Sequence, residues 1–120
     1  MRSFLRAIRR VLERARVTSR SLWERVRQPV LMELVTGELP PRLRRRRLYI
    51  VSDDGFDEEA AMICPCGCKQ VLYMNLLTDE RPCWRIDRDD RNLPTLHPSV
   101  WRQKGCCSHF WLKRGRIVWC

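Results

Sequence analysis

Cysteines gather in two short stretches of the chain, and this clustering constrains the fold more than any other feature of the sequence. The first stretch, CPCGC, covers residues 64–68, and the second, GCCSH, covers residues 105–109. Structural zinc is held tetrahedrally by four Cys or His ligands that come in short groups from separate turns. The two stretches therefore predict one zinc site that joins two distant parts of the chain. The candidate ligands are Cys64, Cys66, Cys68, Cys106 and His109.

These candidates exceed the four ligands that zinc needs, and two arrangements follow. If four cysteines hold the metal, the site is closed and structural, and His109 is available for another role. If His109 is a ligand, one cysteine is idle, and a site with three protein ligands and a water would be catalytic. The sequence leaves both arrangements open, together with a third in which the cysteines are only buried apolar side chains.

The cysteine content also bears on where the protein acts. The chain has seven cysteines, so any scheme of disulfides alone would leave one unpaired. It shows no secretory signal and no run of roughly 18 apolar residues of the kind that spans a membrane. We therefore expect a cytoplasmic protein, in which cysteines stay reduced and more often bind metal or do chemistry than form disulfides.

Charge divides the chain into two parts. Residues 1–47 contain 14 arginines and 4 glutamates, whereas residues 48–120 contain 10 basic and 10 acidic side chains. Apolar residues recur at helical spacing from about Ser3 to Arg27, and arginines fill the other faces. We therefore predict that residues 1–47 form a basic amphipathic helix and an arginine-rich linker, and that residues 48–120 form a zinc-binding β-domain.

The residue pattern after residue 48 is typical of short strands. β-Branched and aromatic runs alternate with turn signals such as Asp53-Asp54-Gly55. Strands are predicted at residues 48–52, 58–63, 69–77 and 84–88, a hairpin at 108–119, and mostly loop at 92–101, where two prolines occur. The predicted fold class is mainly β: a small antiparallel, zinc-stapled, ribbon-like domain preceded by an amphipathic N-terminal α-helix.

Two sets of residues could carry out chemistry. Ser99, on a proline-flanked loop, and His109 would form a nucleophile and a base, with a nearby aspartate to orient the imidazole. The candidates for that aspartate are Asp87, Asp89 and Asp90. Alternatively, zinc would polarise a water from which Glu58 or Glu59 removes a proton.

The order of the motifs resembles a small bacterial family of unknown-function domains. The motifs are CPCGC, a strand with LYMNL, a tryptophan strand, TLHPSVW, GCCSHFW and a closing RGRIVW. The resemblance covers roughly residues 48–120, and it matches the family at Cys64, Cys66, Cys68, Ser99, Cys106, Ser108 and His109. Members are linked to operons that encode ubiquitin-like proteins with their activating and conjugating enzymes, some of them in phage defence.

The resemblance implies a peptidase that processes or deconjugates a ubiquitin-like protein, with that protein and its conjugation enzymes as partners. A second hypothesis has no catalysis: a zinc-ribbon module would bind nucleic acid or an acidic protein through residues 1–47. A cleft that joins Ser99, His109 and a carboxylate would favour the peptidase, whereas a basic face that continues onto the β-domain would favour the binding module.

Overall fold

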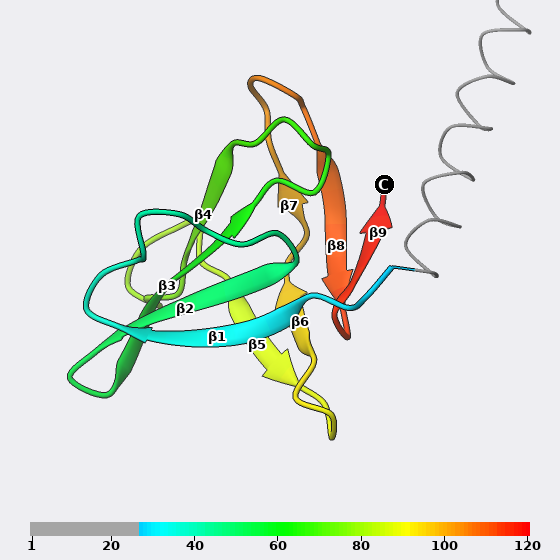
Figure 1. Ribbon diagram of the computed structural model, residues 1–120. Helices are drawn as coiled ribbons and strands as arrows, with labels where there is room; N and C mark the ends of the chain where they lie inside the picture. Colours follow the sequence, from blue (N-terminus) through cyan, green and yellow to red (C-terminus); the bar gives the residue numbers. More distant parts are fainter. Residues whose placement is uncertain (1–26) are drawn as a thin grey trace, which may run out of the picture.

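The computed structural model describes residues 27–120, which form nine strands and no helix (Figure 1). Apart from Arg27, the helix predicted from Ser3 to Arg27 lies outside the described residues. The mainly β fold class is confirmed for the described part. Among residues 27–120 there is no helix of the length and apolar character needed to cross a membrane.

The first sheet has four strands in the order β1-β2-β3-β4. Its strands are β1 (Leu31–Thr36), β2 (Arg47–Asp53), β3 (Phe56–Ile63) and β4 (Val71–Asn75). The central strand β2 is buried continuously from Leu48 to Val51, which is the pattern of a strand covered on both faces. The turn from β2 to β3 uses Asp54 and Gly55, both at positive φ, as a tight hairpin requires.

Two smaller sheets complete the fold. One pairs β5 (Arg85–Arg88) with β6 (Pro94–His97), and the other contains β7 (Val100–Trp101), β8 (His109–Lys113) and β9 (Arg116–Trp119). The predicted final hairpin is present, with Arg114 and Gly115 at positive φ in its turn. On β8, Phe110 and Leu112 are buried, so His109 and Trp111 lie on the opposite, half-buried face.

All three sheets contribute to one hydrophobic core. The ring of Phe110 meets that of Trp119 edge to face, with the centroids 5.7 Å apart. The core residues are Val30, Leu48, Ile50, Ala60, Met62, Cys64, Leu72, Met74, Leu96, Val100, Phe110, Leu112 and Ile117. Because Cys64 belongs to this cluster, the first cysteine stretch is anchored in the core.

Gly115 connects the three sheets through its backbone. Its carbonyl accepts a hydrogen bond from the N–H of Val30 (2.7 Å), just before β1, and its own N–H donates to the carbonyl of Pro94 (2.8 Å) in β6. A Cβ at this position would lie 2.9 Å from the Val30 carbonyl oxygen. Only glycine fits here without a backbone shift.

Three features differ from the sequence prediction. The segment 92–101 was predicted to be mostly loop, but it contains β6 and β7; Pro94 stands at the first position of β6, where a missing N–H is tolerated. The first sheet begins at Leu31, before the residue-48 boundary predicted for the β-domain. β1 also runs parallel to β2, whereas the other strand pairs are antiparallel as predicted.

Candidate metal centre and serine–histidine pair

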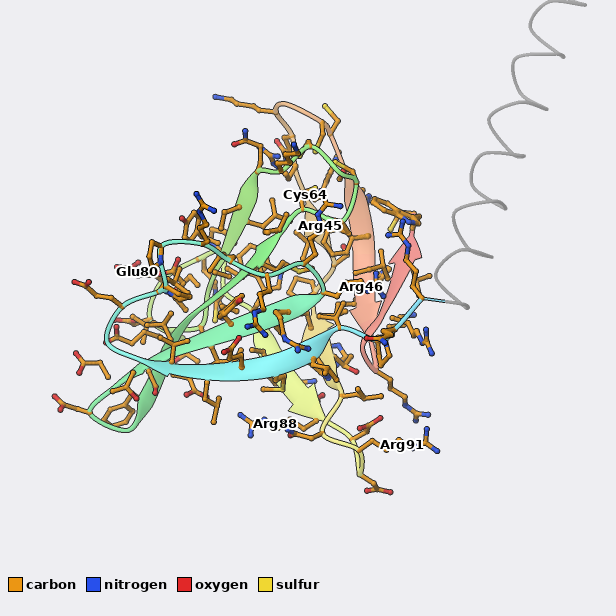
Figure 2. The ribbon with its side chains drawn as sticks, viewed as in Figure 1. Arg45, Arg46, Cys64, Glu80, Arg88 and Arg91 are labelled. Carbon is orange, nitrogen blue, oxygen red and sulfur yellow. The ribbon has the colours of Figure 1, made fainter. Side chains whose placement is uncertain are left out.

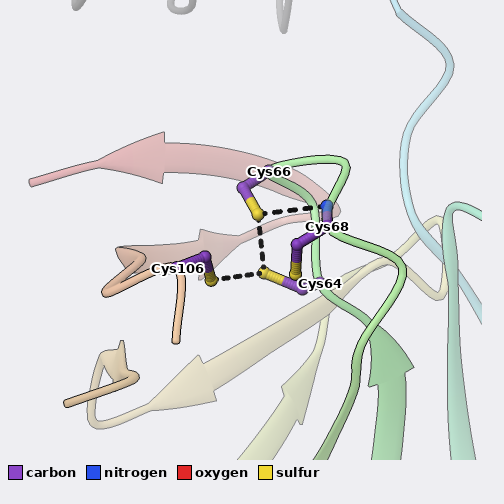
Figure 3. A group of neighbouring side chains, drawn as sticks. All are labelled: Cys64, Cys66, Cys68 and Cys106. Atoms are coloured by element: carbon purple, nitrogen blue, oxygen red, sulfur yellow. Dashed lines mark hydrogen bonds between the residues drawn. The ribbon is translucent and has the colours of Figure 1, made fainter. Parts of the chain in front are cut away.

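Four cysteines, here called the cysteine cluster, come together from two loops (Figure 3). Cys64, Cys66 and Cys68 lie in the loop between β3 and β4, and Cys106 lies in the loop between β7 and β8. Their Sγ atoms are all within 4.8 Å of one another. These four side chains could hold a metal ion.

The backbone of the first loop turns the sulfur atoms toward a common point. The N–H of Cys64 donates to the carbonyl of Gln70 (2.7 Å), which closes the loop. Gly67 has φ +95°, a conformation that L residues rarely adopt, and it lets the chain reverse between Cys66 and Cys68. The N–H of Cys68 then donates to the Cys66 sulfur (3.3 Å). An amide donor aimed at a sulfur favours the thiolate form that a metal requires.

The two loops place their cysteines in different environments. Burial raises the pKa of the Cys64 thiol to about 12. The hydroxyl of Ser108, 3.2 Å from the sulfur of Cys106, lowers the pKa of that exposed thiol to about 6. Arg102 donates from its guanidinium to the sulfurs of Cys68 (3.6 Å) and Cys106 (3.5 Å). Its positive charge offsets part of the negative charge that four thiolates would bring together.

Four thiolates are the donor set of a closed tetrahedral zinc site. Soft sulfur ligands select zinc, copper(I) or iron over magnesium or calcium. Among residues 27–120, His109 and the acidic side chains are not part of the cluster. A four-cysteine site leaves no coordination position open for a water, so its chemistry is that of a structural metal site.

His109 lies against Ser99 instead. The Ser99 Oγ and the His109 Nε2 are 3.0 Å apart, so the hydroxyl donates to the imidazole when the ring proton is on Nδ1. Ser99 is placed between β6 and β7, and His109 is the first residue of β8. The ring of Trp101 stacks on that of His109, with centroids 5.1 Å apart and planes at 19°. This arrangement corresponds to the sequence alternative in which four cysteines cluster and His109 is released.

Of the three candidate aspartates, Asp87 and Asp89 are engaged elsewhere, and none of the three forms an ion pair with His109. Asp87 is 3.1 Å from the Nε2 of His97, and it also faces Arg85. Asp89 accepts hydrogen bonds from the backbone of Arg91 and Leu93 and so stabilises the turn between β5 and β6. Within residues 27–120, no carboxylate is in salt-bridge range of His109.

The structure also reveals supporting residues that the sequence reasoning missed. Arg102 contacts two sulfurs of the cysteine cluster, and its place four residues before Cys106 was the available signal. Trp84 donates its indole N–H to the carbonyl of Ser99 (3.4 Å), and no sequence pattern indicated that contact.

Comparison with known proteins gives one match. No curated protein and no solved structure matches the chain. A sequence model of one protein family matches residues 35–120, which include the cysteine cluster, Ser99 and His109. The family is described as bacterial ubiquitination-like system serine protease (BubE). The match covers well over half of the 120 residues, and the chain therefore belongs to the BubE family.

Proposed function

We propose that the protein is a serine peptidase that cleaves a ubiquitin-like protein, either to process its tail or to remove it from a conjugate. Ser99 is the nucleophile, His109 is the general base, and a zinc ion held by the cysteine cluster is structural. The observation that carries the proposal is the 3.0 Å contact between the Ser99 Oγ and the His109 Nε2 in a member of a family described as serine proteases.

Peptide cleavage by this pair follows the usual course of acyl transfer. The Ser99 oxygen forms a bond to the scissile carbonyl carbon while its proton passes to the His109 Nε2, and the carbonyl electron pair moves onto oxygen. When the carbonyl re-forms, the C–N bond breaks and His109 returns the proton to the leaving amine. A water then repeats the sequence with His109 as base, which releases the carboxylic acid and restores the Ser99 hydroxyl.

The imidazole of His109 is oriented by its stacking on Trp101 and by its position on β8. Trp101 stacks on one face of the His109 ring, and the same two residues are opposite each other in the β7–β8 pair. Stacking restricts rotation of the ring about its side-chain bonds, and so it keeps Nε2 directed at Ser99. The pair therefore acts without a carboxylate from residues 27–120 against the imidazole.

The cysteine cluster would support the pair through a short stretch of chain. Ser99 and His109 flank the segment that contains β7 and the loop with Cys106. The N–H of Arg102 donates to the carbonyl of Ser108 (2.8 Å) and closes this loop. Zinc bound by the four thiolates would crosslink the loop to the β3–β4 loop and contributes stability rather than a reactive water.

The first test is cleavage of a ubiquitin-like protein encoded beside this protein, fused at its C-terminus to a reporter domain. We expect the wild-type protein to release the reporter and Ser99→Ala to abolish release, with about one zinc per chain in both. Ser52→Ala, on β2 away from the pair, is the matched control and retains cleavage. Equal cleavage by wild type and Ser99→Ala would assign the reaction to another group.

A second candidate function rests on a concentration of arginines. Arg45 and Arg46 lie near Cys64 (Figure 2), and they border a 140 Å³ hollow that Cys64 also lines. A further hollow of about 410 Å³ is lined by Arg27, Gln28, Pro29, Arg44, Arg45, Arg46 and Arg47. We call the surface around these two hollows the arginine hollow. This positive surface supports the alternative of a binding module for nucleic acid or an acidic protein.

The two functions are separated by salt dependence and charge removal. If the arginine hollow holds a polyanion, the full-length protein binds duplex DNA or RNA with an affinity that falls steeply with salt, and Arg44→Ala combined with Arg45→Ala weakens it. Arg88→Ala combined with Arg91→Ala removes the same charge from the β5–β6 region and serves as control. Equal affinity of both double variants would exclude the arginine hollow as the binding site.

A further inference from the structure

A cleft of about 630 Å³ borders the chain segment that leads into Ser99. Its lining includes His97 and Pro98, the two residues that directly precede Ser99 in the chain. It also includes Trp111, which lies two residues after His109 on the same face of β8. The chain segments that position the serine–histidine pair therefore continue as walls of this cleft, here called the tryptophan cleft.

The walls are mainly apolar and are held in place by contacts outside the cleft. Trp84 is fixed at two points: its indole N–H donates to the Ser99 carbonyl (3.4 Å), and its backbone N–H donates to the carbonyl of Asn75 (2.8 Å). The ammonium of Lys113 lies 5.2 Å from the ring centroid of Trp111. Leu76 and Ile86, both half-buried, complete the apolar lining. The volume falls within the roughly 300–1,000 Å³ typical of ligand sites.

The basic side chains at the rim of the tryptophan cleft differ in whether an acidic side chain pairs with them. Arg85 and His97 both face Asp87, at 3.5 Å and 3.1 Å. Arg81 is exposed, and it forms no ion pair with any residue of the described part of the chain. Asp57 is the one carboxylate in the lining. Arg81 is therefore the rim cation that remains available to an acidic group of a ligand.

We propose that the tryptophan cleft binds the substrate segment beside the scissile bond, with a large apolar side chain against Trp84, Ile86 and Trp111 and an acidic residue next to it that contacts Arg81. The proposal rests on the peptidase function and deepens it by naming the class of peptide cleaved. Burying an aromatic or branched apolar side chain yields more binding energy than the backbone alone, so this contact sets the position of the cut. Trp84 has a double role, because it forms a wall and also holds the Ser99 carbonyl.

Binding is measured on full-length Ser99→Ala, so that catalysis is not required. The probe is a blocked hexapeptide, acetyl-Gly-Gly-Phe-Glu-Gly-Gly-amide, titrated to millimolar concentration while indole signals are followed by nuclear magnetic resonance. We expect saturable shifts of the Trp84 and Trp111 indoles, and a loss of affinity of at least about tenfold when Ala replaces Phe in the peptide. Absence of saturable shifts at both indoles would overturn the proposal.

Two substitutions in the same background test the walls and the rim separately. Ile86→Glu places a charge in the apolar wall and lowers affinity for the hexapeptide by at least about tenfold. Arg81→Glu, on an exposed side chain, reverses the preference between the Glu peptide and its Lys counterpart. Arg91→Glu makes the same charge change in the β5–β6 turn, outside the cleft lining, and leaves both affinities unchanged.

Cleavage by proteins with Ser99 intact then separates the cleft from the peptidase function. If peptides are cleaved in a Ser99-dependent manner but Arg81→Glu and Ile86→Glu leave kcat/KM and peptide preference unchanged, the tryptophan cleft is not the specificity site and the peptidase function stands. If the hexapeptide shifts both indoles but no peptide or ubiquitin-like fusion is cleaved, the peptidase function falls and the cleft remains a peptide-binding site.

Discussion

The cysteine cluster and the serine–histidine pair both draw on the stretch from Ser99 to His109, which contains Cys106, yet they are built in opposite ways. The cluster contains four side chains of one type from two loops, enough donors to fill a tetrahedral metal site if a metal is bound. The pair contains two unlike side chains in contact, and the chemistry proposed for it would also need a bound substrate. The difference separates stability from function, and the two regions should therefore respond differently to mutation.

The largest effect is expected from removal of a cluster ligand. Cys106→Ser leaves three thiolates, so metal content falls from about one ion per chain to near zero. Stability falls with it, because structural zinc supplies roughly 10–16 kcal/mol of apparent binding energy in small zinc peptides. Elemental analysis and thermal unfolding provide the measurements. Cys107→Ser, at the neighbouring exposed cysteine that lies outside the cluster, is the control and should change neither quantity.

Removal of His109, the proposed general base, should abolish cleavage without changing the metal content of the protein. His109→Ala lowers kcat/KM for a ubiquitin-like fusion by at least about a thousandfold, since Ser99 loses its proton acceptor, while metal content stays at about one ion per chain. Ser52→Ala, on β2 away from the pair, is the control and should change neither kcat/KM nor metal content. Loss of metal in His109→Ala would place this residue among the ligands and overturn the division between the two regions.

Substitution of Arg102 should weaken metal binding by the cysteine cluster without abolishing it. Arg102→Ala removes the cation that donates to two cluster sulfurs, so metal affinity should fall about 10- to 100-fold, the range for outer partners of metal ligands. Competition with a chromophoric chelator measures the change. Lys104→Ala removes a positive charge from the same loop without contacting a sulfur, and similar losses in both variants would attribute the effect to net charge alone.

The smallest effect concerns the ring that stacks on His109. Trp101→Ala frees the imidazole to rotate and lowers kcat by a few-fold, because an aromatic contact contributes about 0.5–1.5 kcal/mol. Trp101→Phe should restore most of the rate. Tyr73→Ala, at an exposed aromatic residue on β4, controls for the loss of surface area. Unchanged kcat in Trp101→Ala would show that the β8 backbone alone orients His109.

The two regions also differ in how far they could be predicted from the sequence. The cysteines were identified because metal ligation imposes a local spacing, as in CPCGC. Which four of the five candidates cluster depends on how the β7–β8 loop meets the β3–β4 loop, and spacing does not contain that information. The Ser99–His109 contact was a hypothesis for the same reason, although the two residues are only ten positions apart.

The fold prediction was wrong where strand pairing is non-local and where a proline lies at the end of a strand rather than in a loop. The final hairpin and its turn were predicted correctly, because Arg114-Gly115 specifies the turn locally. Pro94 and Pro98 suggested loop, but β6 begins at the first and ends before the second. The parallel partner of β1 lies beyond an intervening loop, so VLMELV gave no indication of where it would pair. Trp84 lines the tryptophan cleft because of tertiary packing, and no periodic pattern in the sequence indicates that position.

Gly115 links the order of synthesis to the assembly of the three sheets. Its hydrogen bonds to Val30 and Pro94 connect the three sheets, and they form only after residue 115 has left the ribosome. N-terminal segments emerge first, so β1 to β4 can pair early, whereas Ser99, Cys106 and His109 appear late. A nascent chain that has completed its first sheet still lacks the fourth thiolate and both members of the pair. A chain that has formed only its first sheet would therefore lack the residues of the proposed peptidase site.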